Sequence, residues 1–343
     1  MNTRSFIKFA AAGIAAATVV ASVGLLAGAG DASPKKTYEF GVIAKSQSNP
    51  VFQAARTGAE DAAKELSAKY GVEVKINWRT PNNEDAQQQA QYVEQLASQG
   101  VDGISVSCSD AKVLKGAIDS AVGKGVEVVT FDSDSPDSKR FAYYGINDVD
   151  AGKAVMKELA KAMGDKGVVA ILGGNANATN LQNRIKGVEE ELKNHPNIKL
   201  KDKFYHPETA AEAAQKVQSV QSANPEITGW AMVGGWPLFT KNALDGVYEH
   251  AKVVSVDHLP EQLTYVRNGQ VQALIGQDCY GWGHQTVMML FDKVHNNKKP
   301  ATVVNNFELK TVTKENVDEY AGLWDKWLGK KKDEAKPAEP AKK

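Results

Sequence analysis

The sequence predicts an α/β protein with two doubly wound parallel sheets, and three observations lead to this prediction. Short apolar or alternating segments of strand length are separated by longer segments with apolar residues at helical spacing, the pattern of strands joined by crossover helices. The pattern starts again after Asn147-Asp148. The chain has 343 residues, and even without about the first thirty it is too long for one simple core. We therefore expect two domains of similar architecture.

The first domain should contain four strands and three connecting helices. The strands are expected at residues 38–44, 72–78, 101–107 and 126–131. The helices are expected at residues 51–70, 86–99 and 111–123. In the second of these helices Ala86, Ala90, Val93 and Leu96 share one face, and Gly100 follows at the position where a helix commonly ends.

The second domain should repeat this alternation. Its helices are expected at residues 151–163, 183–193, 210–222 and 238–250. Its strands are expected at residues 167–172, 198–205, 227–233 and 253–257. Because the two halves are similar and follow one another along the chain, they indicate two domains and not one long sheet.

Both ends of the chain differ from this pattern. Residues 1–32 have the composition of a signal peptide, because Arg4 and Lys8 are basic, residues 9–26 are apolar and small residues follow. Cleavage could fall after Ala29 or after Ala32, and removal is favoured over the alternative of a membrane anchor. We therefore expect export to the periplasm. Residues 329–343 consist of Gly, Lys, Asp, Glu, Ala and Pro and are expected to form a disordered tail.

Composition and motifs argue against several classes of function. The formal net charge is zero, so the chain lacks the basic excess that nucleic-acid binding requires. We expect no metal or cofactor, because the six His show no ligand spacing with Cys or with each other. No dinucleotide fingerprint, nucleophile elbow or Walker loop is present, so an enzyme is not expected. Cys108 and Cys279 are either two buried thiols, which we favour, or one disulfide.

The residues that directly follow the predicted strands are rich in polar and aromatic side chains, and ligands of open parallel sheets bind at this edge. The polar side chains are Asn49, Asp132, Arg184, Asp257 and Gln277. The aromatic side chains are Phe52, Phe131, Trp236 and Tyr280. Each has a structural alternative when taken singly, such as an Asp that only caps a helix or a Phe131 in the core. As a group they suit a sugar, because polar side chains pair with hydroxyl groups and rings cover C–H faces.

The same regions carry a resemblance to a known family. Its landmarks are Ser48-Asn49-Pro50-Val51-Phe52, Gln99-Gly100-Val101-Asp102-Gly103-Ile104, Val129-Thr130-Phe131-Asp132-Ser133-Asp134, Asn183-Arg184-Ile185-Lys186-Gly187, Val254-Ser255-Val256-Asp257 and Ile275-Gly276-Gln277-Asp278. With these landmarks the chain resembles the periplasmic sugar-binding proteins of the ribose-binding type, the solute receptors of ABC importers. The resemblance covers about residues 38–312, and it is specific because the landmarks occur together and in order.

The resemblance implies which residues contact the ligand. Contact positions of the family hold Lys45, Asn49, Phe52, Asp132, Arg184, Asp257 and Gln277. The chain departs from ribose receptors where Ser133 replaces Arg, where Gly234-Gly235 replaces Asn-Asp, and where Trp236 adds bulk. We include Ser133 and Trp236 in the predicted ligand site and expect Phe52 and Trp236 to form apolar walls. The pocket should therefore not be interpreted as a ribose pocket. Four classes of ligand remain as alternatives: a pentose, a hexose, an inositol-like polyol and a furanosyl signal.

The resemblance also implies the periplasmic binding protein type I fold, in which a three-strand hinge joins the two lobes. Crossings are expected near Ile146-Asn147, Gln277-Asp278 and Asn306. The first lobe would then comprise residues 36–146 plus 278–305, and the second residues 147–277 plus 306–328. A sugar that contacts both lobes binds the closed form better and shifts the population toward it.

The function that follows is that of a monomeric receptor, which binds a monosaccharide or similar polyol and delivers it to the membrane permease of an ABC importer. The alternative is a secreted sensor of a sugar or furanosyl autoinducer that reports to a chemoreceptor or kinase, because either partner could recognise the closed form. A transcription regulator of the same fold is not expected, because a signal peptide stands where a DNA-binding helix-turn-helix would be.

Overall fold

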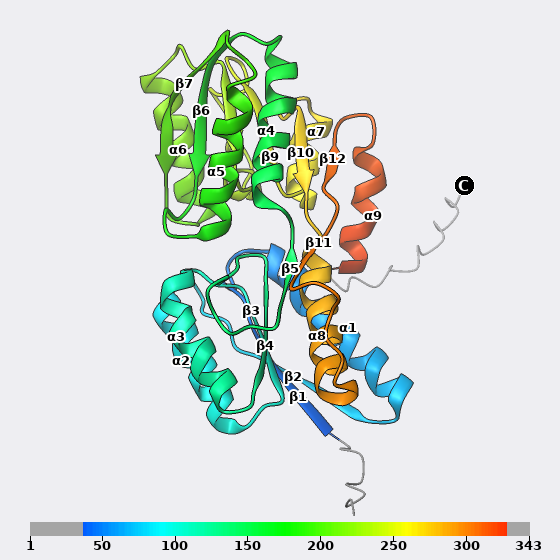
Figure 1. Ribbon diagram of the computed structural model, residues 1–343. Coiled ribbons are helices and arrows are strands. Elements are labelled where there is room, and N and C mark those ends of the chain that lie inside the picture. Colours follow the sequence, from blue (N-terminus) through cyan, green and yellow to red (C-terminus); the bar gives the residue numbers. More distant parts are fainter. Residues whose placement is uncertain (1–36, 328–343) are drawn as a thin grey trace, which may run out of the picture. The chain divides into compact units, whose positions relative to one another are not determined.

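The computed structural model describes residues 37–327, and these residues form two α/β lobes, each with one six-stranded sheet (Figure 1). The predicted signal peptide and the predicted disordered tail lie outside the described residues. The fold class predicted from the alternating pattern is confirmed. None of the helices in residues 37–327 is both long and apolar enough to cross a membrane.

The first lobe begins with the alternation that the sequence predicts. Its elements are β1 (Thr37–Ile43), α1 (Val51–Tyr70), β2 (Glu73–Trp78), α2 (Ala86–Gln99), β3 (Gly103–Val106), α3 (Ala111–Gly123), β4 (Glu127–Phe131) and β5 (Ala142–Gly145). The predicted strands and helices are confirmed to within a few residues at their ends. Strand β5 was not predicted, because a four-residue strand is too short to show a periodic pattern.

The second lobe follows directly. Its elements are α4 (Asp148–Met163), β6 (Gly167–Gly173), α5 (Thr179–Leu192), β7 (Ile198–Tyr205), α6 (Ala210–Ala223), β8 (Gly229–Met232), the 3₁₀ helix η1 (Trp236–Phe239), β9 (Lys252–Val256), α7 (Pro260–Arg267) and β10 (Ala273–Gly276). The remaining elements are α8 (Cys279–Asn296), β11 (Val304–Asn306), β12 (Lys310–Val312) and α9 (Val317–Trp327). Helix α5 begins four residues before the predicted start at Asn183.

The two sheets repeat one topology. Their strand orders are β2-β1-β3-β4-β5-β11 and β7-β6-β8-β9-β10-β12. All neighbouring strands are parallel except β10 and β12, which are antiparallel. The chain passes from one sheet to the other between β5 and β6, between β10 and β11, and between β11 and β12 (Figure 1). The carboxyl ends of β1, β3 and β4 in one lobe, and of β6, β8 and β9 in the other, are the edges from which the site is built.

The predicted helix at residues 238–250 is wrong. Only η1 is helical in this region, and residues 241–250 form successive turns. Asn242 and Gly246 adopt left-handed backbone conformations (φ 61° and 72°), which an α-helix cannot contain. The Tyr265 hydroxyl also binds the backbone here, accepting from the Ala243 N–H (3.0 Å) and donating to the Thr240 carbonyl (2.5 Å). A buried side chain from α7 thus replaces the hydrogen bonds that a helix would make.

Helices α4 and α5 approach so closely that their backbones touch, and this contact positions α5 for the site. A Cβ on Gly152 would lie 1.9 Å from the Arg184 carbonyl oxygen, and one on Gly187 would lie 2.0 Å from the Val149 carbonyl oxygen. Only glycine fits at such distances. Gly187, the last residue of the landmark Asn183-Arg184-Ile185-Lys186-Gly187, therefore has a packing role that periodicity alone does not reveal.

We expect Gly152→Ala to destabilise the fold by about 1–3 kcal/mol, because the new methyl group overlaps backbone that can move only if α5 moves. Gly116→Ala is the matched control: Gly116 also lies inside a helix, but a Cβ there meets nothing within 4 Å. That substitution should stabilise by about 0.5–1 kcal/mol. Urea unfolding of the two variants and the wild type measures both effects, and equal effects of the two substitutions would contradict the packing argument.

Helix α9 covers His258 in the second lobe with three aromatic rings. The centroids of Tyr320, Trp324 and Trp327 lie 5.3, 5.8 and 5.6 Å from the imidazole, each edge to face. His258 is 3% exposed, and its Nδ1 has no hydrogen-bond partner within residues 37–327. Burial lowers the pKa of His258 to about 4. The folded protein therefore holds this imidazole neutral where the unfolded chain, with a pKa of about 6.5, would already protonate it.

His258→Phe should reduce the loss of stability in acid. Between pH 6.5 and 4 the unfolded wild type binds a proton at His258 that the folded state does not, so the free energy of unfolding falls as the pH falls, by about 3 kcal/mol from this residue. Phenylalanine keeps the ring packing and removes the titration. Urea unfolding at pH 7 and pH 4.5 measures the difference, and an unchanged pH slope in the variant would show that His258 is protonated in the fold.

Candidate functional site

Asp132 and Asp257 occupy equivalent places in the two lobes. Each follows directly after a central strand, β4 or β9, and each has a left-handed backbone (φ 54° and 72°). The Asp132 N–H donates to the Tyr144 carbonyl (3.1 Å), and the Asp257 N–H donates to the Ile275 carbonyl (2.9 Å). A left-handed backbone is uncommon for residues other than glycine, although Asp and Asn adopt it more readily than most. The backbone turns both carboxylates toward the same space.

One cavity brings together eight of the nine residues predicted to bind a ligand. From the first lobe come Lys45, Asn49, Phe52 and Asp132; from the second and its edge come Arg184, Trp236, Asp257 and Gln277. The cavity is also lined by Val51, Asn180, Leu181, Glu208, Gly234 and Trp282. The rule that ligands of parallel sheets bind at the carboxyl ends of the strands (the strand-end rule) therefore identified residues that share one cavity although they are far apart in the sequence. Their contact with a ligand stays a prediction.

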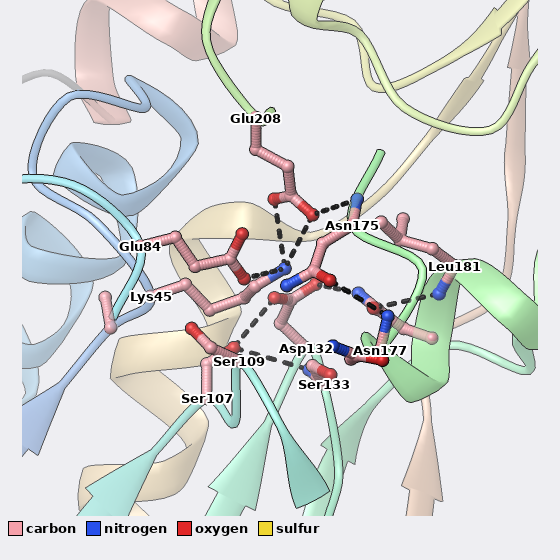
Figure 2. Close-up of polar contacts among 12 residues, drawn as sticks. Lys45, Glu84, Ser107, Ser109, Asp132, Ser133, Asn175, Asn177, Leu181 and Glu208 are labelled. Atoms are coloured by element: carbon pink, nitrogen blue, oxygen red, sulfur yellow. Dashed lines mark hydrogen bonds and ion pairs between the residues drawn. The ribbon is translucent and has the colours of Figure 1, made fainter. Parts of the chain in front are cut away.

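Ser133 is the predicted residue that does not line this cavity. It is fully buried behind Asp132, its carbonyl accepts from the Cys108 N–H (2.8 Å), and its own N–H lies 3.4 Å from the Ser107 hydroxyl. These contacts join the ends of β3 and β4, and Figure 2 shows the one between Ser133 and Ser107. Cys108 itself is buried and free, as is Cys279, which confirms two buried thiols.

Arg184 is buried and fixed by three contacts. Its Nε donates to Asp148 (2.8 Å), and its two terminal nitrogens donate to the Val233 carbonyl (3.1 Å) and to Gln277 Oε1 (3.0 Å). Asp148 is held at the first turn of α4, whose N-cap, Asn147, accepts from the backbone N–H groups of Val149 and Asp150. A guanidinium has five N–H donors, so two remain for other partners.

Gln277 continues this network to the second aspartate. Its Nε2 donates to Asp257 Oδ1 (2.6 Å), while Asp257 Oδ2 accepts from the Gly235 N–H (3.3 Å). Burial raises the pKa of Asp257, although Arg184 and Gln277 oppose the shift. Because Gln277 follows β10, it lies where the chain leaves the second sheet for α8.

Asp132 makes contacts within its own lobe and across to the other. Its Oδ2 accepts from the Ser107 hydroxyl (2.8 Å, Figure 2), and its Oδ1 accepts from Asn180 of α5 (3.2 Å). Arg184 lies 3.9 Å from the same Oδ1. Sequence analysis missed Asn180, yet it precedes Arg184 by four residues and so lies on the same helix face.

Lys45 lies among carboxylates. Its ammonium contacts Glu84 (3.0 Å) in the first lobe and both carboxylate oxygens of Glu208 (3.1 and 3.3 Å) in the second, as Figure 2 shows. Burial alone would lower the pKa of Lys45, but the charges of Glu208 and Glu84 outweigh it and raise the pKa above its ordinary value. Neither glutamate was among the predicted site residues. They follow β2 and β7, the edge strands, so extending the strand-end rule to these strands would have found them.

Aromatic rings form the apolar part of the cavity. Phe52 packs on Trp282 with ring centroids 5.9 Å apart. Trp236 fits beside the strand end because Gly234 has no side chain: a Cβ there would lie 2.0 Å from the indole. The departure Gly234-Gly235 and the bulk of Trp236 are thus one structural feature. Phe131 is fully buried, and neither it nor Tyr280 lines the cavity.

The cavity is narrow in this structure. The volume open to the centre of a water molecule is about 20 Å³, which is room for one water. A sugar ring therefore enters only if the lobes separate or side chains move. Within residues 37–327 no group of three or more His, Cys, Asp or Glu is arranged to hold a metal ion.

The sequence matches a family model described as a periplasmic binding protein domain, over residues 40–298. The chain belongs to this family. Among curated relatives, this periplasmic binding protein is 28% identical to a xylitol-binding protein of Mycolicibacterium smegmatis, over 75% of this chain and 73% of the relative. It is 27% identical to a D-allose-binding periplasmic protein of Escherichia coli, over 76% and 86% of the two chains.

Solved structures of the family resemble this periplasmic binding protein in sequence and in fold. A solute-binding protein of an ABC transporter from Burkholderia graminis, in complex with D-arabinose, superposes with a TM-score of 0.76 at 28% identity, covering 82% of this chain and 97% of that one. A glucose-galactose binding protein from Geobacillus stearothermophilus superposes with a TM-score of 0.73 at 25% identity, covering 82% and 99%.

Proposed function

We propose that this protein binds a monosaccharide or a similar polyol between its two lobes and delivers it to the permease of an ABC importer. The observation that carries the proposal is the shared cavity, in which Asp132 of the first lobe and Asp257 of the second face the same space as Arg184. Carboxylates that accept and a guanidinium that donates can hold neighbouring hydroxyl groups. Phe52, Trp282 and Trp236 supply flat apolar surfaces for C–H faces.

The relatives support a neutral polyhydroxylated ligand. Their names refer to xylitol and D-allose, and a similar structure contains D-arabinose. These compounds share several adjacent hydroxyl groups and carry no charge. The similar solute-binding protein of an ABC transporter also supports a role in import. None of the relatives named above is described as a sensor, so they do not support the alternative function.

The proposal also covers the cellular location and the oligomeric state of the protein. We infer export to the periplasm through a cleaved signal peptide at residues 1–32, and action as a monomer without nucleic acid. We infer no catalysis, because the similar proteins are named for binding and the sequence has no dinucleotide fingerprint, nucleophile elbow or Walker loop. The rigid lobes are proposed to be residues 36–146 plus 278–305 and residues 147–277 plus 306–328, with hinge segments at the three crossings.

A thermal-shift screen tests the ligand class. Xylitol, D-allose, D-ribose and D-arabinose are compared with a sugar acid and an amino sugar. A ligand at a hundred times its dissociation constant should stabilise the fold by about 2.7 kcal/mol. Uptake of the best ligand by cells with and without the protein then separates import from sensing, because only import requires the protein for uptake. A full panel without any shift would count against sugar binding.

Arg184→Ala should weaken sugar binding by at least about 2 kcal/mol, because it removes buried charge-assisted hydrogen bonds and leaves Gln277 Oε1 without its donor. Arg140→Ala is the matched control. Arg140 is also buried and pairs with an aspartate, Asp134, but does not line the cavity. It should lower stability and leave affinity unchanged in isothermal titration. If both variants lost the same affinity for the sugar, the prediction that Arg184 contacts the ligand would be wrong.

Binding should make the protein more compact. Asn49, Phe52 and Asp132 belong to one lobe and Arg184 and Trp236 to the other, so a small ligand contacts both sets only when the lobes are together. Small-angle scattering at saturating ligand should give a smaller radius of gyration than without ligand. Equal radii would mean that closure does not accompany binding.

A further inference from the structure

An outer groove lies next to the cavity, and Glu208 lines both. The groove has a volume of about 520 Å³. It is bounded by Ser48, Asn83 and Glu84 from the first lobe, and by residues 174–176 and 205–209 from the second. The inner cavity contains the carboxylates and rings of the proposed sugar site, and Glu208 is the side chain common to both spaces.

Glu208 is held firmly in this place. Both of its carboxylate oxygens contact the Lys45 ammonium, and Oε1 also accepts from the Asn175 N–H (3.2 Å). Figure 2 shows Glu208 reaching down to Lys45, with Glu84 on the other side of the ammonium. The side chains of Lys45 and Glu208 are 4% and 7% exposed. A ligand group that pushed Glu208 aside would have to break a buried ion pair and an amide hydrogen bond together.

We propose that Glu208 determines specificity by size: it forms the outer wall of the sugar cavity in the closed form and rejects any ligand with a substituent on the hydroxyl group that faces it. This inference rests on the proposed sugar binding. The ion pair with Lys45 crosses from one lobe to the other, so the wall is complete only when the lobes are together. The ligand class is then an unsubstituted monosaccharide or polyol, and glycosides extended toward the outer groove are excluded.

Three substitutions separate the effect of the size of the Glu208 side chain from the effect of its charge. Glu208→Ala removes the wall, but Lys45 keeps Glu84 as a partner at 3.0 Å, so no buried ammonium is left unpaired. Glu208→Gln keeps the volume and removes the charge. Glu84→Ala is the matched control, because Glu84 also binds Lys45 but lines only the outer groove. Circular dichroism confirms the fold of each variant.

The experiment uses whichever of xylitol, D-allose, D-ribose and D-arabinose binds the wild type most tightly, with the full set of its mono-O-methyl ethers, one for each hydroxyl group. The wild type should bind the ether that faces Glu208 at least a hundredfold more weakly than the parent. Glu208→Ala should regain at least tenfold in affinity for that ether alone. Glu208→Gln and Glu84→Ala should discriminate as the wild type does.

Two outcomes would contradict the proposal that Glu208 excludes substituted ligands by its size. One is a Glu208→Ala variant whose affinities for parent and ethers all change by the same factor, because a wall acts on one position only. The other is a Glu208→Gln variant that accepts the ether as well as Glu208→Ala does, because the exclusion would then depend on charge and not on size. A wild type that binds none of the four parent compounds would instead contradict the proposed function.

Discussion

The guanidinium of Arg184 is buried, and a buried charge is strongly destabilising unless charged and polar partners surround it. Its partners come from separate parts of the chain: Asp148 at the start of α4, Val233 after β8 and Gln277 after β10. Gln277 in turn orients Asp257. The close approach of α4 and α5 at Gly152 makes this possible, because it brings Arg184 within reach of Asp148. One buried cation thereby holds Gln277 and, through it, Asp257 at the wall of the cavity.

The cavity contains more carboxylates than cations. Asp132, Asp257 and Glu208 line it, with Lys45 and Arg184 as the cations. Burial raises the pKa of Glu208 above its ordinary value, although the charge of Lys45 opposes the shift. An excess of buried acceptors favours ligands that offer many donors, and a polyol does so without adding charge. The same excess disfavours anions, which agrees with the uncharged ligands of the relatives.

The alternating pattern of the sequence was sufficient for most of the fold. It failed at residues 238–250, where the apolar spacing resembles a helix but Tyr265 from α7 binds the backbone of Thr240 and Ala243. It was silent on β5, because so short a strand is recognised only by its neighbours in the sheet. It also gave no prediction for the elements after β9, which are α7, β10, α8, β11, β12 and α9. The strand-end rule found the residues after the central strands. It missed Glu208 because the edge strands, whose ends also reach the cleft, were left out.

The sequence by itself determined the two α/β lobes, the carboxylates after β4 and β9, and the family, since these depend on local periodicity and on residues adjacent to it. Only the tertiary structure decided which of these residues share a cavity. It turned Lys45 toward Glu84 and Glu208, placed Ser133 behind Asp132, and paired Trp236 with Gly234. The physical reason is that burial requires each charge to have a partner and each ring to have space. Some of these requirements are met by residues far apart in the sequence, such as Lys45 and Glu208, whose meeting no local pattern records.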